Sequence, residues 1–181
     1  MSDLKELIVK FKALRDALPE VMPAVATSVS LSAKAIAERT IKDKGFGELY
    51  SAVDVPAWFL EGKQLNNSGK NFLDNINESD YPFTNWGELR KAQGLQNSHV
   101  DLTYSGKMWA GMFPQDVEVI GVKYVAPLGN NNKEGQNKMN WNFDRYGDFV
   151  GRTLTGDNLD LLYNVAFDEL VRLIDEKIFN K

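Results

Sequence analysis

The sequence contains no cysteine and only one histidine among its 181 residues. The absence of cysteine excludes a disulfide framework, a thiolate zinc site and a cysteine nucleophile. No apolar run approaches the roughly 20 residues that a membrane-spanning helix needs, so we expect no membrane contact. Basic residues are fewer than acidic ones, 21 against 25, and no basic face typical of nucleic-acid-binding domains is evident.

The residues that are present make up a globular composition. Hydrophobic residues account for 43% of the chain and charged residues for 25%, which is typical of a folded domain and not of a disordered chain. The N-terminal segment MSDLKELIVKF is amphipathic and lacks the layout of a signal peptide. We therefore expect one soluble domain over residues 1–181, made in the cytoplasm, that has no enzymatic activity and needs no cofactor.

Three segments have the apolar periodicity of helices. Residues 3–18 form the first, and Pro19 is expected to end it. A second helix runs from about residue 20 or 22 to 43, followed by Gly45 at the left-handed position after its end. The last helix covers about 158–179, with Asp157 or Thr155 as its cap. Its apolar arc is wider than one core face needs, so either the helix is largely buried in its own fold or part of the arc contacts another subunit.

The centre of the chain is more irregular. Residues 85–94 fit a short helix that begins at Asn85 and ends at Gly94, and a helical turn carrying Met108 and Trp109 should stop at Pro114. Alternating residues over 117–122 predict a strand, residues 129–138 predict a polar loop, and an aromatic patch follows at 141–149. We thus expect an α+β fold in which the N- and C-terminal helices pack on a small, mostly antiparallel sheet, with an irregular, turn-rich insertion at about 47–84.

No catalytic or metal-binding motif stands out. His99 has only Asp101 as a nearby acidic residue, so a structural role is favoured over a general base. The Gly62–Asn71 stretch has the wrong spacing for a phosphate loop, and Asp157–Asp160 lacks the glycine and distal glutamate of a calcium loop. Two alternatives stay open. One is a small hydrolase with carboxylates assembled in space; the other is a nucleic-acid-binding module that uses Lys63, Lys70, Arg90 and Lys91 with Trp58 and Trp86.

The most informative segment is Val100–Trp109, VDLTYSGKMW. It resembles the Leu-x-x-[Thr/Ser]-Gly-[Arg/Lys]-[Leu/Met] signature of the tail-completion and head–tail joining (neck) proteins of tailed bacteriophages. In that family a short helix and then a β-hairpin follow the signature, a Tyr-Ala segment and a polar loop come next, and the domain ends in a helix. Here Pro114–Val122, Tyr124–Ala126, Gly129–Lys138 and the C-terminal helix resemble those parts.

The resemblance implies a non-enzymatic virion component. Identical subunits would close into a ring at the head–tail neck or the tail terminus, join head and tail, and let genomic DNA pass through the lumen as cargo only. Other partners would be virion proteins: a portal or adaptor, a tail tube or a tail hub. The 47–84 and 129–138 segments would become ordered on docking. The residues that we expect at subunit or partner contacts are Leu102, Tyr104, Gly106, Lys107, Met108, Trp109, Phe167, Val171 and Ile174.

Overall fold

The computed structural model of the chain describes residues 2–50, 53, 55, 85–102 and 106–179. The fold is α+β, as expected: it is mostly helical, with short antiparallel strands. The chain forms two compact units, one of residues 1–39 and 103–181 and the other of residues 40–102. The second unit is thus inserted in the first, and it extends beyond the expected insertion at 47–84, most of which lies outside the described residues.

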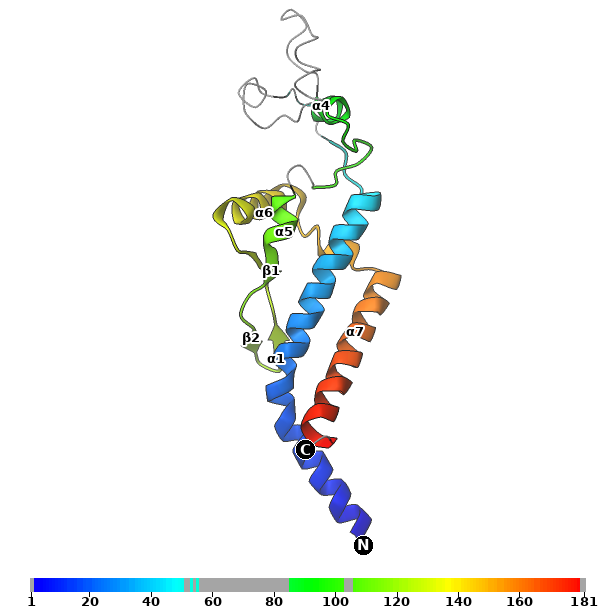
Figure 1. The fold of residues 1–181 in the computed structure, drawn as a ribbon, viewed down its shortest axis with the longest axis vertical. Helices are drawn as coiled ribbons and strands as arrows, with labels where there is room; N and C mark the ends of the chain where they lie inside the picture. Colours follow the sequence, from blue (N-terminus) through cyan, green and yellow to red (C-terminus); the bar gives the residue numbers. More distant parts are fainter. Residues whose placement is uncertain (1, 51–52, 54, 56–84, 103–105, 180–181) are drawn as a thin grey trace, which may run out of the picture. The chain divides into compact units, whose positions relative to one another are not determined.

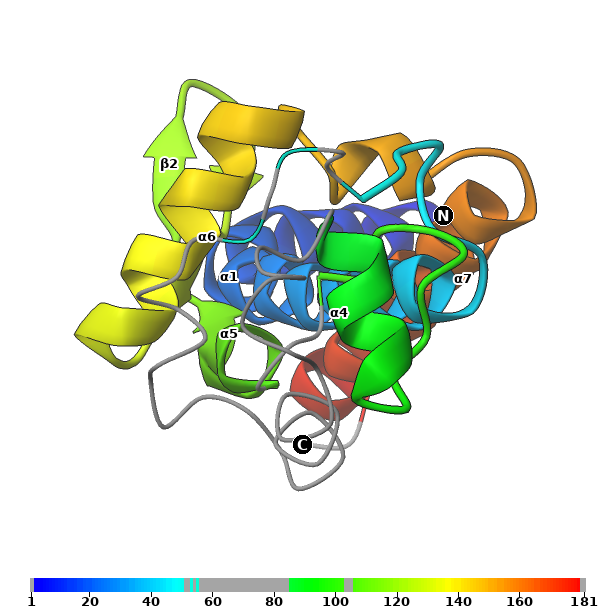
Figure 2. The same ribbon diagram turned by 90° about the horizontal axis from the view of Figure 1, so that it is seen from above.

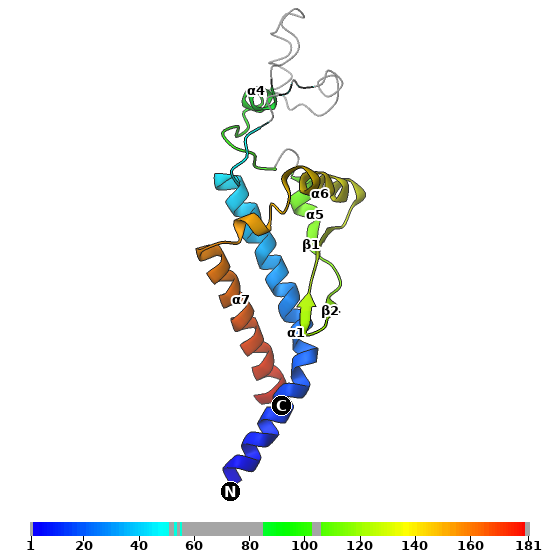
Figure 3. The same cartoon turned by 180° about the vertical axis from the view of Figure 1, so that it is seen from behind.

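The longest element is α1, which spans Ser2–Lys44 as a single helix (Figure 1). The prediction that Pro19 ends a first helix is wrong, because both Pro19 and Pro23 lie inside α1. Each proline removes one N–H from the helical ladder. Thr27 Oγ1 donates a hydrogen bond of 3.0 Å to the Pro23 carbonyl oxygen. Figures 1 and 3 show the N-terminal part of α1 bent relative to the rest, which is the usual effect of proline in a helix.

Two nested antiparallel strand pairs follow the short helix α5 (Lys107–Gly111). The outer pair joins β1 (Met112–Pro114) to β4 (Leu128–Asn130), and the inner pair joins β2 (Glu118–Ile120) to β3 (Lys123–Val125). Val119 lies opposite Tyr124 in the inner pair. Gly121, at the first position of the connecting turn, has φ +63°, as favoured hairpin turns require. The predicted strand over 117–122 is confirmed only for Glu118–Ile120, because Gly121 and Val122 form the turn. The strand β1, which contains Pro114, was not predicted.

Helix α6 (Lys133–Tyr146) replaces most of the predicted polar loop at 129–138. That loop prediction is wrong because the asparagines there build the start of a helix. Asn132 is the N-cap, and its side-chain oxygen accepts a hydrogen bond of 2.6 Å from the Gly135 N–H. The Asn130 amide donates to the Met108 carbonyl oxygen at 2.8 Å. A β-carbon on Gly135 would clash with the Asn130 side-chain amide, so a larger residue there would have to displace the amide that donates to Met108.

An aromatic core lies between α5, α6 and the segment after α6. Trp109 of α5 packs edge-on against Phe149, with ring centroids 5.9 Å apart. Phe143 of α6 lies 4.5 Å from the same Phe149 ring. Met108 and Met139 are also buried. The predicted aromatic patch at 141–149 therefore divides: Phe149 is in the core, whereas Trp141 is exposed.

The C-terminal helix α7 spans Asp157–Ile174 and continues into a π-helical turn, η3 (Asp175–Phe179). Its N-cap is Gly156 with no side-chain cap, so the prediction of Asp157 or Thr155 as cap is wrong. Figures 1 to 3 show α1 between α7 on one side and the strands with α6 on the other. The short η2 helix (Gly151–Thr153) precedes α7.

Two contacts fix the register of α7 against α1. Ser28 Oγ donates a hydrogen bond of 3.3 Å to Glu169, and Lys177 forms an ion pair with Glu20. The partners on both helices are eight residues apart and run in opposite directions, so the two helices are antiparallel. Because Lys177, near the end of η3, lies opposite Glu20, the first turns of α1 extend past the end of α7 (Figure 1).

The inserted unit contains the last turn of α1 and the helix α4 (Trp86–Ala92). The predicted helix at 85–94 is confirmed at both ends. The Asn85 side chain accepts a hydrogen bond of 2.9 Å from the Glu88 N–H, and Gly94 has φ +70° after the helix. The predicted position of Gly45 is also confirmed, because it has φ +69° just beyond α1.

Candidate subunit interface

The outer face of α7 carries a continuous apolar stripe. It consists of Leu159, Tyr163, Phe167 and Val171, which recur every four residues and therefore lie on one side of the helix. Tyr163 and Phe167 are about two-thirds exposed, at 65% and 66%. No residue of α7 is fully buried. The alternative that this helix is largely buried in its own fold is therefore wrong, and its wide apolar arc leaves one part, here called the α7 stripe, in solvent.

A second exposed stripe lies on the first turns of α1. It consists of Leu4, Leu7, Ile8 and Phe11 and is here called the α1 stripe; Leu4 is 64% and Phe11 62% exposed. The apolar periodicity of these residues predicts a helix but does not by itself show that they are exposed. Val21 and Val25 continue the same spacing farther along α1 and are buried. The helix therefore carries one apolar seam, of which the chain covers only the C-terminal part.

Charges of opposite sign border the two stripes. Lys5 and Lys12 each follow a residue of the α1 stripe by one position, and Asp160 and Asp168 each follow a residue of the α7 stripe by one position. All four side chains are exposed and take part in no hydrogen bond or ion pair within the described part of the chain. Both stripes therefore resemble a protein contact, which has an apolar centre and a polar rim.

The tip of the inner strand pair is a third apolar surface. Val119 and Ile120 are about 60% exposed, and Val122 in the turn is 94% exposed. Exposed valine and isoleucine at the end of a hairpin are a liability for a lone domain, because unpaired strand edges and apolar patches favour association. The residues of this tip belong to neither of the two helical stripes and lie between them in the sequence.

The residues of the signature segment that were predicted at the contact have different positions in the structure. Tyr104 lies outside the described residues. Gly106 has φ +70° and directly precedes α5, so its role is to begin that helix. Leu102 also has a positive φ of 52°, which is rare for a residue with a side chain. Lys107 is exposed and forms an ion pair of 2.9 Å with Glu134 of α6, which ties α5 to α6.

Met108 and Trp109 require a correction. Both are buried in the chain's own core, at 3% and 1% exposure, so they are not available to a neighbouring subunit. The sequence did not distinguish a core position from a contact position here, because large apolar side chains occur at both. The Trp109 indole N–H has no hydrogen-bond partner among the described residues. Of the predicted contact residues on α7, Phe167 and Val171 are exposed and Ile174 is half-buried.

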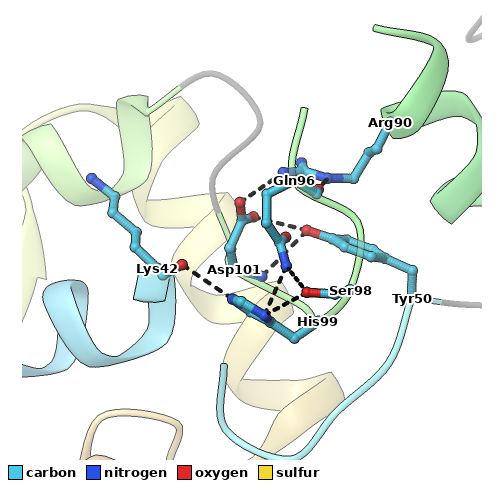
Figure 4. Close-up of polar contacts among 7 residues, drawn as sticks. All are labelled: Lys42, Tyr50, Arg90, Gln96, Ser98, His99 and Asp101. Atoms are coloured by element: carbon cyan, nitrogen blue, oxygen red, sulfur yellow. Dashed lines mark hydrogen bonds and ion pairs between the residues drawn. The ribbon is translucent and has the colours of Figure 1, made fainter. Parts of the chain in front are cut away.

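The inserted unit holds a buried polar cluster, shown in Figure 4. Arg90 of α4 pairs with Asp101 at 2.7 Å, and the two side chains are 5% and 9% exposed. The Tyr50 hydroxyl donates to the same carboxylate at 2.8 Å, and the Arg90 guanidinium lies 4.8 Å from the centre of the Tyr50 ring. Burial is the main cause that raises the pKa of the Tyr50 hydroxyl above its usual range. These contacts join α4 to the segments on either side of it.

His99 has the structural role that the sequence favours. Its Nε2 lies 3.1 Å from the Lys42 carbonyl oxygen in the last turn of α1, and its Nδ1 lies 2.7 Å from the Gln96 amide nitrogen (Figure 4). The neutral ring with its proton on Nε2 satisfies both contacts, because Nε2 then donates and Nδ1 accepts. A carbonyl at the end of a helix lacks a helical partner, and His99 supplies one.

The alternative functions gain no support from these positions. Arg90, one of the cations named for nucleic-acid binding, is buried in the ion pair with Asp101. Lys91 is exposed and Trp86 half-buried, while Trp58, Lys63 and Lys70 lie outside the described residues. Among the described residues, no three histidine or acidic side chains gather where they could hold a metal ion. None of the described helices is both long and apolar enough to span a bilayer.

Comparisons of the chain with protein-family models, with curated proteins and with solved structures found no match.

Proposed function

We propose that this chain is a non-enzymatic structural protein of a tailed-phage virion. Identical copies form a ring at the head–tail neck or the tail terminus, which joins head and tail and lets DNA pass through its lumen. The observation that carries the proposal is the uncovered apolar surface of the two terminal helices. Apolar side chains repeated on one helix face are normally covered, and an exposed contiguous patch marks an interaction site.

The order of elements supports the same proposal. The signature segment resembles that of phage neck and tail-completion proteins, for which a short helix, a hairpin and a C-terminal helix are implied. The chain has α5, the nested strand pairs and α7 in that order after the signature. The net charge of −4 is compatible with a lumen that lets DNA slide, because a basic wall would hold the phosphates.

A ring also accounts for two different apolar surfaces on one chain. A closed ring of identical subunits uses a heterologous contact, in which one patch of each subunit meets a different patch of the next. The α1 stripe and the α7 stripe are two such patches on the same compact unit. A dimer with twofold symmetry needs only one self-complementary patch.

Electron microscopy and native mass spectrometry of the purified full chain test the proposal. We expect discrete rings with a single copy number, alone or after addition of the portal, adaptor and tail proteins encoded in the same genome. A chain that stays monomeric at high concentration and binds none of these virion proteins contradicts it. Salt-sensitive binding to single-stranded DNA by that monomer would favour the nucleic-acid alternative instead.

A further inference from the structure

We propose that the α1 stripe of one copy packs on the α7 stripe of a second copy of this chain, with the two helices antiparallel. This contact deepens the proposed ring and rests on that proposal for the number of copies and the place of assembly. It specifies which two surfaces meet and how they are oriented.

The α1 stripe cannot reach the α7 stripe of its own chain. Lys177 lies opposite Glu20, so the residues of α1 before Glu20 extend past the end of α7. The α7 stripe lies farther up the helix, between Leu159 and Val171, and points away from the α1 contact made by Glu169. The two stripes of one protomer are thus both uncovered and kept apart, and a second copy supplies the missing partner of each.

The α1 stripe is continuous with a helix contact that the protomer already makes. Leu4, Leu7, Phe11, Leu14, Leu18, Val21 and Val25 follow alternating steps of three and four residues. This spacing is the seam by which two helices pack along their length. Val21 and Val25 are buried within the unit, whereas Leu4, Leu7 and Phe11 are exposed. The exposed part therefore has the pattern for packing on another helix, and the occupant it fits is a helix with an apolar stripe of its own.

The dimensions of the two stripes agree. At 1.5 Å per residue, the exposed α1 stripe from Leu4 to Phe11 is about 10 Å long, and the α7 stripe from Leu159 to Val171 is about 18 Å long. The longer stripe can therefore cover the shorter one completely. Three aromatic side chains, Phe11, Tyr163 and Phe167, supply the large anchors that protein contacts favour.

The bordering charges fix the orientation. Lys5, Lys12, Asp160 and Asp168 each follow an apolar residue of their stripe by one position, so they lie on the same rotational side of their helices, whereas Arg172, which follows Val171, is already paired with Glu169 and Glu176. Two helices packed face to face bring these sides together only if they run antiparallel. In that arrangement Lys5 lies next to Asp168 and Lys12 next to Asp160, since the lysines are seven and the aspartates eight residues apart. Both pairs are of opposite sign, which favours this orientation over the parallel one.

Disulfide cross-linking tests the contact directly, because the chain has no cysteine of its own. Antiparallel packing brings Phe11 near Tyr163 of the other copy. We expect Phe11→Cys mixed with Tyr163→Cys to give a cross-linked dimer on mild oxidation, and the double variant to give a ladder of linked copies. The matched control is Leu31→Cys with Tyr163→Cys, because Leu31 is an exposed apolar residue of α1 that lies outside the stripe.

Each other result of the cross-linking overturns the proposal in a defined way. Linking of Phe11→Cys to Val171→Cys instead of Tyr163→Cys means that the helices do not pack in the proposed antiparallel register. Linking of Phe11→Cys to itself means a symmetric pairing of two α1 stripes. Equal linking of Leu31→Cys means an unspecific contact. A double variant that closes within one chain means that the α1 stripe reaches its own α7.

A charge exchange provides a second test. We expect Lys5→Glu with Lys12→Glu to weaken self-association by about tenfold at low salt, with a smaller effect at high salt. Adding Asp160→Lys and Asp168→Lys in the same chain should restore it. The proposed pairs are contradicted if the variant with all four substitutions self-associates no more strongly than the variant with only the two lysine substitutions. If rings form without a Phe11–Tyr163 link, the proposed contact is wrong but the proposed function is not affected. If copies are linked through Phe11 and Tyr163 but never enter a virion, the proposed function is wrong but the contact is not affected.

Discussion

The Arg90 guanidinium and the Asp101 carboxylate form an ion pair of 2.7 Å in which neither side chain has more than a tenth of its surface in solvent. Arg90 also donates from Nε to the Gln96 carbonyl oxygen at 2.7 Å. A buried ion pair adds little stability compared with apolar residues, but removing one partner leaves an uncompensated charge in the interior. This asymmetry makes the pair a sensitive probe of the inserted unit.

We expect Asp101→Asn to lower the free energy of unfolding of the inserted unit by about 3 kcal/mol, because Arg90 keeps its charge without a counterion. Urea unfolding and hydrogen exchange of the α4 amides measure the loss. Asp16→Asn is the control, since the Asp16 side chain is 65% exposed in its ion pair with Arg15 and such pairs contribute little. Unchanged protection of α4 in Asp101→Asn would contradict the role given to the pair.

Gly45 is expected to tolerate alanine less well than Gly94 does. Both have a left-handed φ, +69° and +70°, so alanine costs each of them about 1 kcal/mol. A β-carbon on Gly45 would also lie 2.8 Å from the His99 side chain, whereas a β-carbon on Gly94 would have none of the described residues within 4 Å apart from its chain neighbours. Thermal unfolding of Gly45→Ala and Gly94→Ala should show a larger loss for the first. Equal losses would mean that His99 moves aside without cost.

Truncation of Trp109 should lower the stability of the monomer, whereas truncation of Phe167 should weaken self-association. Trp109→Ala removes a side chain that is 1% exposed, and we expect a loss of about 3–5 kcal/mol in the free energy of unfolding. Phe167→Ala removes one that is 66% exposed, so the stability of the monomer should hardly change while self-association weakens. Chemical denaturation and analytical ultracentrifugation measure the two effects. A well-folded Trp109→Ala variant would contradict the assignment of Trp109 to the core.

Glu134 should make the contact between α5 and α6 sensitive to acid. Hydrogen bonds from Lys138 and Lys107 lower the pKa of Glu134 from 4.5 to about 2 in the folded chain. A lowered pKa means that the carboxylate contributes stability above pH 4.5 and that this contribution is lost as the pH falls toward 2. The stability difference between wild type and Glu134→Gln should therefore shrink over this range. Thermal unfolding from pH 7 to pH 2, with an NMR titration of Glu134, measures it; a constant difference would contradict the shift.

The fold class and several element ends could be predicted from local chemistry. Asn85 and Gly94 bound a helix because their side chain and backbone conformation suit its two ends. The strand over 117–122 followed from alternation, and its hairpin turn depends on Gly121. These features depend on a few neighbouring residues and are therefore visible in the sequence.

Other elements depended on competition between local and longer-range effects. Pro19 was expected to end a helix, yet Leu14, Leu18 and Val21 keep the same apolar phase across it. That continuity was the signal in the sequence that the helix continues through Pro19. The packing of Val21 in the core outweighs the hydrogen bond that the proline removes. Residues 129–138 looked like a loop because they are polar, but capping by Asn132 and the burial of Met139 suffice for a helix.

The candidate interface was only partly predictable. The wide apolar arc of the last helix pointed to Phe167 and Val171, which are exposed. The sequence could not show that Met108 and Trp109 are core residues and not contact residues. Their burial depends on residues distant in the sequence, such as Phe149, which packs against Trp109. The α1 stripe depends on where α7 ends relative to Glu20, and that length difference is a property of the folded pair of helices.

Pro19 and Pro23 lie where α1 passes from its exposed turns to its buried ones, on either side of Val21. The tilt of the free end is therefore governed by missing backbone hydrogen bonds more than by side-chain packing. The bend at the two prolines sets the direction in which Leu4, Leu7 and Phe11 face a neighbouring molecule, whereas Val25 is held in the core. The orientation of the exposed surface and the packing of the interior are therefore determined by different residues of one helix.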